Sequence, residues 1–347
     1  MGHMKKYKCP ICKTTKDVVK FGYRNKIHRL FCKACCKHYS FNPRFLDKKQ
    51  IMIDHLDGLS FRDLSRRHKI SSMTAWRICR EELKKLPDNN QFTFKYCQNY
   101  STILVTDGKY FNVVNSRNNP NWILLWSLDY FHHDIPIIDI VPSESYSAWA
   151  RFFSYFRIIK QNPNLLICDD NTNLKMAAYN KFPGVKIQTC HNHFKENIRR
   201  NLNVRSDNRY IPFMRRIEDV LGHKLNNIDM SRRLFALYRD YREDPVAISV
   251  LTNIERSKEQ LLGYRGISQA PLTTNIIEGM NGHIEQRLKS ICSFQSVTNA
   301  KLWFNGLMLK RRLTKFTDCK GKFKYMNGKT GIDRTKKDGV DIPSYFD

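Results

Sequence analysis

Apolar and polar residues follow different periods in successive parts of the chain. From residue 99 onward, three apolar runs have the character of strands: STILVTDGKYFNVV, NWILLWSLDY and IPIIDIVP, separated by short turns. We expect them to form an antiparallel meander. The next segments alternate between helical and strand character, in the order SYSAWARFFSYFRII, LLICD, NLKMAAYNKF and VKIQT. This part of the chain predicts a mixed α/β domain in the order three strands, helix, strand, helix, strand.

The segments that follow are helical. Residues 196–262 carry three amphipathic runs, IPFMRRIEDVLGHKL, MSRRLFALYRDYRE and VAISVLTNIERSKEQLL, so we expect an all-helical insertion. A further amphipathic helix is predicted in TTNIIEGMNGHIEQRLK. KRRL at 310–313 and the Lys- and Gly-rich tail predict a basic, partly ordered extension.

Residues 48–84 carry the pattern of a helix-turn-helix. Ile51, Ile53 and Leu56 suit a first amphipathic helix, and SFRDLSRRHKISSMTAWRICREEL predicts two more with a break near Ile70. The core of the three helices is expected to contain Leu64, Ile70, Trp76 and Ile78. The outward residues of the last helix, which would contact DNA, are Ser72, Thr74, Arg77 and Arg80. Such helix triplets also occur as plain packing units, and this alternative stays open.

Two Cys-x-x-Cys pairs near the N-terminus indicate a bound metal. They are separated by 19 residues, which suits tetrahedral coordination of a structural Zn²⁺ by Cys9, Cys12, Cys32 and Cys35. So short a segment cannot bury enough core to fold alone, and metal binding would stabilise it. Cys36 and His38 are close enough in sequence to leave the fourth ligand open. Between the pairs, the basic residues expected to contact DNA are Arg24, Lys26 and Arg29.

Three acidic residues stand in separate apolar contexts. Asp107 lies in the first predicted strand of the α/β domain, Asp169 ends the fourth, and Glu278 lies near the start of an amphipathic helix. The element order is that of a ribonuclease H-like domain, which places one aspartate on its first strand and another at the tip of its fourth. Carboxylates converging from distant segments suit a pair of Mg²⁺ ions, which take oxygen ligands. Asp170 follows directly, and the sequence favours Asp169 over it without excluding it.

The charge of the chain indicates a polyanionic partner. Lys and Arg number 60 and Asp and Glu 32, which gives a formal net charge of +28. A basic surface of this size attracts phosphate backbones, so we expect nucleic acid to be the partner. No apolar run is long enough to span a bilayer, and we expect a soluble, intracellular protein with no membrane partner. The eleven cysteines, an odd number with clustered pairs, favour metal binding over disulfides.

With these residues in place, the chain resembles the DDE transposases of the Mutator-like superfamily, including bacterial insertion-sequence enzymes. The resemblance covers roughly residues 99–315. It rests on Asp107-Gly108, Asp169 with Leu174 and the Ala pair 177–178, Phe182-Pro183-Gly184, Cys190-x-x-His193 and Thr274-Asn275-x-x-Glu278-x-x-Asn281 leading into Arg287. It implies that the metal-holding catalytic residues are Asp107, Asp169 and Glu278.

The resemblance also implies cofactors, partners and location. We expect two Mg²⁺ or Mn²⁺ ions per active site, and double-stranded DNA of transposon ends and target as the substrate. A homodimer or larger assembly is expected on the DNA, in a nucleoid-associated, cytoplasmic setting in a prokaryotic host.

Several residues near the acidic motifs have open roles. Cys190 and His193 have three interpretations: structural contact within the core, contact with DNA near the cleavage point, or a metal site. The residues expected to orient Glu278 or contact DNA are Asn275 and Asn281, and those expected to contact phosphates are Arg287 and Lys289.

The sequence therefore predicts a multi-domain α/β protein acting as a DNA transposase. It would bind terminal inverted repeats and catalyse strand cleavage and transfer by a two-metal mechanism. Two alternatives stay open: a non-catalytic zinc-ribbon and helix-turn-helix regulator derived from a transposase, and a ribonuclease H-like DNA nuclease. The expected parts are a zinc ribbon (5–45), a helix-turn-helix (46–86), the first part of the ribonuclease H-like core (95–198), an all-helical insertion (199–265), the Glu-bearing helix of the core (266–316) and a basic C-terminal extension (317–347).

Overall fold

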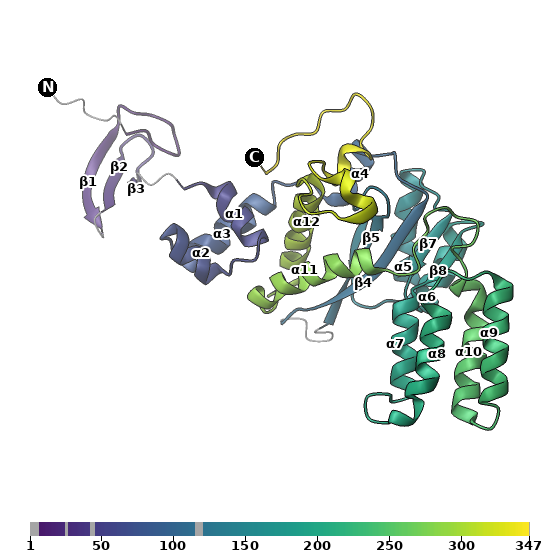
Figure 1. Cartoon of the computed structure of the whole chain (residues 1–347). Helices are drawn as coiled ribbons and strands as arrows, with labels where there is room; N and C mark the ends of the chain where they lie inside the picture. The colour runs from purple at the N-terminus through teal and green to yellow at the C-terminus, as the bar shows by residue number, and fades with distance from the viewer. Residues whose placement is uncertain (1–6, 25–26, 42–45, 115–120, 347) are drawn as a thin grey trace. The chain divides into compact units, whose positions relative to one another are not determined.

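The structure is a computed structural model that describes residues 7–24, 27–41, 46–114 and 121–346. The chain divides into two compact units, Met1–Lys48 and Lys49–Asp347. Figure 1 shows the elements of both. Lys26, one of the expected DNA contacts, lies outside the described residues. The coarse prediction of a mixed α/β protein is confirmed.

The N-terminal unit contains a three-stranded antiparallel sheet, in the order β1-β2-β3. The strands are β1 (Val18–Arg24), β2 (Ile27–Cys32) and β3 (Lys37–Phe41). The pairing of β1 with β2 shifts between Lys20 and Tyr23, where Gly22 has a φ of 90°. Among the described residues of this unit few apolar side chains are buried, chiefly Leu30 beside Cys9 and Cys32. Such a small core leaves most of the stabilisation to other interactions.

The larger unit is built on a five-stranded mixed sheet with the order β6-β5-β4-β7-β8. β4 pairs antiparallel with β5 and parallel with β7, β5 pairs antiparallel with β6, and β7 pairs parallel with β8. The strands are β4 (Ile103–Asn112), β5 (Asn121–Asp129), β6 (Ile138–Val141), β7 (Leu165–Cys168) and β8 (Lys186–Thr189). All four β7 residues are buried, as expected of a strand covered on both faces.

Helices cover the two faces of this sheet because alternate strand residues point to opposite sides. Leu104 and Leu166 join a core with α5 (Tyr146–Ile158) and α6 (Thr172–Lys181). Their neighbours Val105 and Ile167 join a second core with residues of α11 and α12. The bounds of those two helices are α11 (Asn275–Ile291) and α12 (Val297–Leu313). Odd-numbered residues of β4 and β7 therefore face the side on which α11 lies.

Four short helices precede the sheet: α1 (Lys48–Leu56), α2 (Phe61–His68), α3 (Ser72–Leu83) and α4 (Asn89–Tyr96). Ser60 and Asp63 form a capping box at the start of α2, and Ser71 caps α3. The left-handed backbone of Lys69 (φ 53°) at the end of α2 and the Ser71 cap of α3 explain the break that the sequence predicts near Ile70. α3 packs against α12, where a Cβ on Gly306 would lie 2.5 Å from Leu83 Cδ2. A glycine at this position allows the two helices to approach closely.

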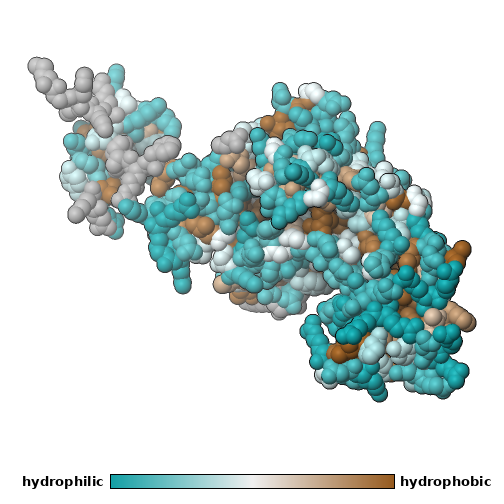
Figure 2. Space-filling model, in the orientation of Figure 1, coloured by the Kyte–Doolittle hydropathy of each residue, from teal (hydrophilic) through white to brown (hydrophobic). Residues whose placement is uncertain are grey.

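A group of helices follows β8: α7 (His191–Asn201), α8 (Ile211–Leu221), α9 (Asn227–Asp240) and α10 (Pro245–Leu261). The buried ring of His191 connects two of them, because its nitrogens each lie 2.8 Å from a carbonyl oxygen, one of Leu221 and one of Leu261. On the face shown in Figure 2 these helices present a largely hydrophilic surface. None of the described helices is long and apolar enough to cross a membrane.

The C-terminal residues pack against the rest of the larger unit. Arg312 of α12 is fully buried and bonds Asp134 through Nε at 2.6 Å and Nη2 at 3.0 Å. Its Nη1 donates to Thr93 Oγ1, and Thr335 Oγ1 donates to Asp134. The prediction that KRRL belongs to a basic, partly ordered extension is wrong for Arg312, because this residue lies within α12 and is fully buried. Residue type alone does not distinguish an arginine that is buried against a carboxylate from an arginine on the surface.

Candidate active site

Two aspartates lie side by side on the adjacent parallel strands β4 and β7, Asp107 within β4 and Asp169 directly after the last residue of β7. Val105 of β4 pairs with Ile167 of β7. Two residues further along each strand stand Asp107 and Asp169, so the parallel register brings them side by side on one face. That is the face on which α11 packs. The sheet therefore places the two carboxylates opposite the helix that carries Glu278.

Asp107 is held by two donors. The Gly108 N–H donates to Oδ1 at 2.8 Å, and Asn281 Nδ2 donates to Oδ2 at 2.5 Å. Asn281 stands three residues after Glu278 on α11, so both side chains project from one face of the helix. Burial raises the pKa of Asp107 to about 7, and the nearby charge of Asp169 adds to the increase. A group of crowded carboxylates of this kind favours a bound proton or a cation.

Glu278 is oriented by its own helix and by α7. Thr274 Oγ1 donates to Oε1 of Glu278 at 2.7 Å. Glu278 Oε1 also lies 3.8 Å from His193 Nδ1 and 3.9 Å from Cys190 Sγ. The Thr274 N–H donates to Cys190 Sγ at 3.3 Å, and the Thr274 hydroxyl oxygen lies 3.1 Å from the same sulfur. The Cys190-x-x-His193 motif therefore connects the end of β8 to the start of α11.

His193 forms an ion pair with Asp169. The hydrogen bond to that carboxylate raises the pKa of His193 to about 11, which keeps the imidazole positively charged at neutral pH. The possible ligand atoms of Asp169, Cys190 and His193 all lie within 4.8 Å of one another. Of the three interpretations of Cys190 and His193, this geometry favours contact within the core, since both side chains already bond neighbours of Glu278.

Asp170 points toward different partners. It forms an ion pair with the buried Lys175, whose Nζ also donates to Gln260 Oε1 at 2.6 Å. Successive residues at a strand end project in different directions, so Asp169 and Asp170 cannot occupy the same site. Asp169 is the one of the two that lies beside His193.

The family model described as "Transposase, Mutator family" matches residues 61–305. The chain belongs to this family. The resemblance drawn from the motifs is thereby confirmed.

This Mutator-family chain also has a distant similarity to a solved structure. Among solved structures, it is similar to a chain in the cryo-EM structure of the simian T-cell lymphotropic virus intasome in complex with PP2A regulatory subunit B56 gamma. The identity is 13%, the match covers 65% of this chain and 76% of that chain, and the TM-score is 0.22. None of the curated proteins matches it.

A fourth carboxylate, Glu144, lies near the site of this Mutator-family chain and was not predicted. A Cβ on Gly108 would lie 2.2 Å from Glu144 Oε1, so the glycine beside Asp107 gives this side chain room. Asn171 donates to Glu144, and burial raises the pKa of the carboxyl group. In sequence, Glu144 stands two residues before the first residue of α5 and reads as an ordinary acidic residue beside a helix N-terminus. Only the space left by Gly108 could have indicated it.

The remaining predicted site residues contact other parts of the chain or are exposed. Asn275 accepts a hydrogen bond from Asn192 at 2.8 Å instead of orienting Glu278, which stands almost one turn further along α11. Arg287 Nε donates to the Leu56 carbonyl at 3.0 Å and links α11 to α1. Lys289 is exposed. Of the residues expected on the outer face of α3, Arg77 is exposed, while Ser72 and Arg80 line a pocket described below.

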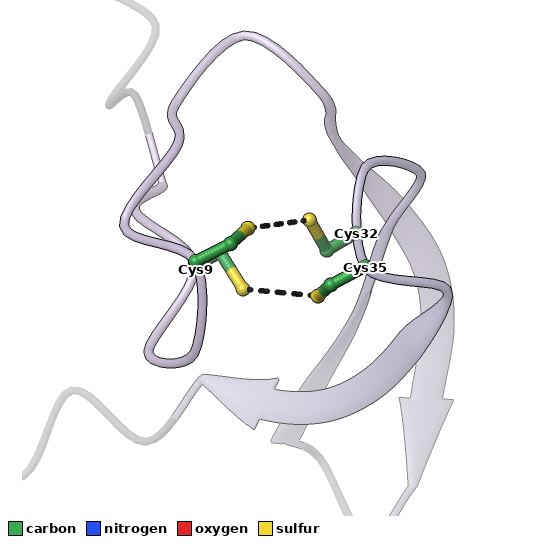
Figure 3. A group of neighbouring side chains, drawn as sticks. Cys9, Cys32 and Cys35 are labelled. Atoms are coloured by element: carbon green, nitrogen blue, oxygen red, sulfur yellow. Dashed lines mark hydrogen bonds between the residues drawn. The ribbon is translucent and has the colours of Figure 1, made fainter.

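The four cysteines of the N-terminal unit form a separate cluster. Cys12 Sγ lies 3.4 Å from Cys32 Sγ, and Cys9 Sγ lies 3.6 Å from Cys35 Sγ (Figure 3). Tetrahedral Zn–S bonds of about 2.3 Å separate the sulfurs by about 3.8 Å, so this cluster fits a zinc ion. The two residues that left the fourth ligand open, Cys36 and His38, stand apart from the described cluster. Cys36 Sγ contacts the Lys33 carbonyl, and the His38 ring packs against Phe21 and Phe31.

Proposed function

We propose that the chain is a DNA transposase that binds the terminal inverted repeats of its element and catalyses divalent-metal-dependent strand cleavage and strand transfer. Membership of the Mutator transposase family supports the general role. The net charge of +28 supports DNA as the substrate. The catalytic core we propose is ribonuclease H-like, and its support is the sheet order β6-β5-β4-β7-β8 with β7 and β8 parallel to β4.

The observation that carries this proposal is the convergence of three acids from distant segments. Asp107 comes from β4, Asp169 from the end of β7, and Glu278 from α11, and His193 contacts the last two. These hard oxygen donors suit Mg²⁺ or Mn²⁺. The raised pKa of Asp107 supports the fit, because it reflects crowding of negative charge that a cation would relieve.

The chain's own residues would prepare the site. Asn281 and Gly108 fix the Asp107 carboxylate, and Thr274 fixes Glu278. The charged His193 offsets part of the negative charge of the cluster before any DNA binds. Two divalent ions, when bound, would supply an activated water or 3′-hydroxyl and stabilise the leaving oxygen of the phosphodiester. No side chain need act as a covalent nucleophile.

DNA recognition is proposed for the N-terminal part of the chain. A zinc ion held by the four cysteines would stabilise the first unit, whose Arg24 is exposed. We propose α2 and α3 as a helix-turn-helix in which the exposed Arg77 contacts DNA. Because a transposase must hold two ends together, we propose a homodimer or larger assembly on DNA.

A cleavage and joining assay tests the proposal. Linear DNA carrying the element's ends is incubated with the protein and Mg²⁺, and 3′-end exposure and joining to target DNA are followed on denaturing gels. Asp107→Asn should lower the cleavage rate at least ~1000-fold, because it removes a charged metal ligand. DNA binding by the same variant should be unchanged in a gel-shift assay.

Three other outcomes would contradict the proposal. Equal cleavage by Asp107→Asn and wild type would reject the assignment of the acidic site. Sequence-specific binding with no cleavage on any end substrate would indicate a regulator. Cleavage of branched DNA irrespective of sequence would indicate a structure-selective nuclease.

A further inference from the structure

A pocket of about 610 Å³ lies between α2, α3 and the segment that joins α11 to α12. Its volume is within the range of small-molecule sites, about 300–1,000 Å³. In Figure 1 these helices lie next to one another. The pocket is separate from the acidic cluster, because none of Asp107, Asp169 and Glu278 lines it.

The lining of the pocket combines aromatic rings with positive charge. Four of its residues are aromatic: Phe61, Trp76, Phe294 and Trp303. Two are arginines, Arg62 and Arg80, and there is no carboxylate among the lining residues. Stacking rings combined with unbalanced positive charge suit an anionic aromatic ligand.

Two lining side chains carry buried N–H groups without an acceptor. Trp303 is 2% exposed, and its indole Nε1 has no hydrogen-bond partner in the described part of the chain. The same holds for Arg80 Nε, although the guanidinium lies 5.6 Å above the Trp76 ring. Both N–H atoms are closed to solvent here, so a ligand atom would accept from them only after the side chains turn toward the pocket. Such a bond would remove the cost of about 1–3 kcal/mol that an unsatisfied buried donor carries.

We propose that this pocket binds one unstacked nucleotide of the DNA on which the protein acts. A nucleobase supplies a flat ring for the aromatic side chains and acceptor atoms for the two N–H groups. Its phosphates would meet Arg62 and Arg80. The pocket reaches Ser72 and Arg80 of α3, so a nucleotide there would belong to DNA already contacted by this helix. This inference rests on the proposed function, because it requires that the chain bind DNA.

Photo-cross-linking tests the inference directly. The probe is a 20-base-pair duplex (of arbitrary sequence, given the basic surface) that carries one 5-iododeoxyuridine as an unpaired bulge. The comparison duplex carries the same base paired with adenine. We expect the bulged probe to cross-link to Trp76, Phe294 or Trp303, as mapped by mass spectrometry, with at least fivefold lower yield for the paired probe. Cross-links confined to other residues would overturn the inference.

Binding measurements with matched variants provide a second test. Trp303→Phe keeps the ring and removes the N–H, and Arg80→Gln removes the charge. Both should weaken binding of the bulged duplex about tenfold. Trp303→Phe should leave the paired duplex within twofold, and Arg80→Gln, which stands on the proposed recognition helix, should weaken the paired duplex less than the bulged one. Arg77→Gln, one turn away and exposed, should weaken both duplexes equally. If Trp303→Phe and Arg80→Gln also weaken both duplexes equally, the pocket does not select an unpaired base.

The failures of the two proposals are distinguishable. If wild-type protein binds both duplexes equally and gives no cross-link at the pocket, the pocket inference is wrong and DNA binding stands. If it binds neither duplex, the proposed function fails together with the inference. Protection by 1 mM dTMP in a thermal-shift assay, with no preference for the bulged duplex, would assign the pocket to free nucleotides and overturn its assignment to DNA.

Discussion

At the scale of single residues, the environment of each acid separates neighbours that look alike in the sequence. Asp169 lies beside His193, whereas Asp170 pairs with the buried Lys175. Glu144 is crowded against Gly108, and Asn281 bonds Asp107. Each role depends on a partner that is distant in the chain.

The pair Asp169 and Asp170 gives the first prediction. Asp169→Asn should abolish Mg²⁺-dependent strand cleavage, with a loss of at least ~1000-fold, because it removes a proposed metal ligand. Asp170→Asn should leave the cleavage rate within fivefold and lower the free energy of unfolding, because Lys175 loses its partner. Cleavage kinetics and urea unfolding of both variants check this. The reverse pattern would assign the metal site to Asp170.

Asp107 gives a pH-dependent prediction for the protein without Mg²⁺. Its folded-state pKa of about 7 is above the ordinary 3.8, so the folded state holds a proton that the unfolded state has lost. Stability is therefore lost as pH rises from about 4 to 7. Asp107→Asn, which stays uncharged, should be more stable than wild type by about 1–2 kcal/mol at pH 8 and by less at pH 5. Urea unfolding at both pH values measures the difference. A constant difference at the two pH values would contradict the prediction.

At the scale of elements, the two structural units differ in what stabilises them. The sheet β1-β2-β3 has few buried apolar residues, and its four cysteines converge on one point. The larger unit has extensive apolar cores on both faces of its sheet. Metal binding should therefore matter for the fold of the first unit alone.

Zinc removal tests that difference. A chelator that extracts Zn²⁺ should abolish amide protection across residues 18–41 and leave β4 and β7 protected. Cys12→Ser should have the same effect, and Cys36→Ser, which leaves the cluster intact, serves as the control. Hydrogen exchange followed by mass spectrometry measures both. Loss of protection in the larger unit would show that the metal supports the whole chain.

At the scale of the whole molecule, Arg312 joins segments from across the larger unit. It bonds Asp134, Asn89 and Thr93, and Thr335 completes the surroundings of Asp134. Both charged side chains are fully buried. Removing one partner leaves an uncompensated charge, whereas removing both does not.

A double-mutant cycle tests this network. Arg312→Met should lower the free energy of unfolding by about 3–5 kcal/mol, because Asp134 is left buried without its cation. Asp134→Asn combined with Arg312→Met should recover part of that loss. Urea unfolding of wild type, both single variants and the double variant gives the coupling. Equal losses for Arg312→Met and the double variant would contradict a buried ion pair.

The sequence by itself determined the elements and the chemistry at their ends. Periodicity predicted the strands of the five-stranded sheet, the helices α8, α9, α10 and α11 and the break before α3, because buried faces repeat with the geometry of each element. It did not predict α4 or α12. Cysteine spacing predicted the cluster, since four thiolates in two short pairs need little long-range information. Asp107 and Asp169 were found for a similar reason: a carboxylate within a buried strand or directly after one stands out against its apolar neighbours.

Only the tertiary structure decided which of these groups meet. The choice between Asp169 and Asp170, the approach of Glu144 and the burial of Arg312 depend on side chains far apart in the chain. The orientation of Arg80 toward a pocket does too. An arginine in a buried ion pair and an exposed arginine are the same residue type and can occur at the same position of the helical hydrophobic pattern. Burial, and the pairing that burial requires, arise only when the elements pack.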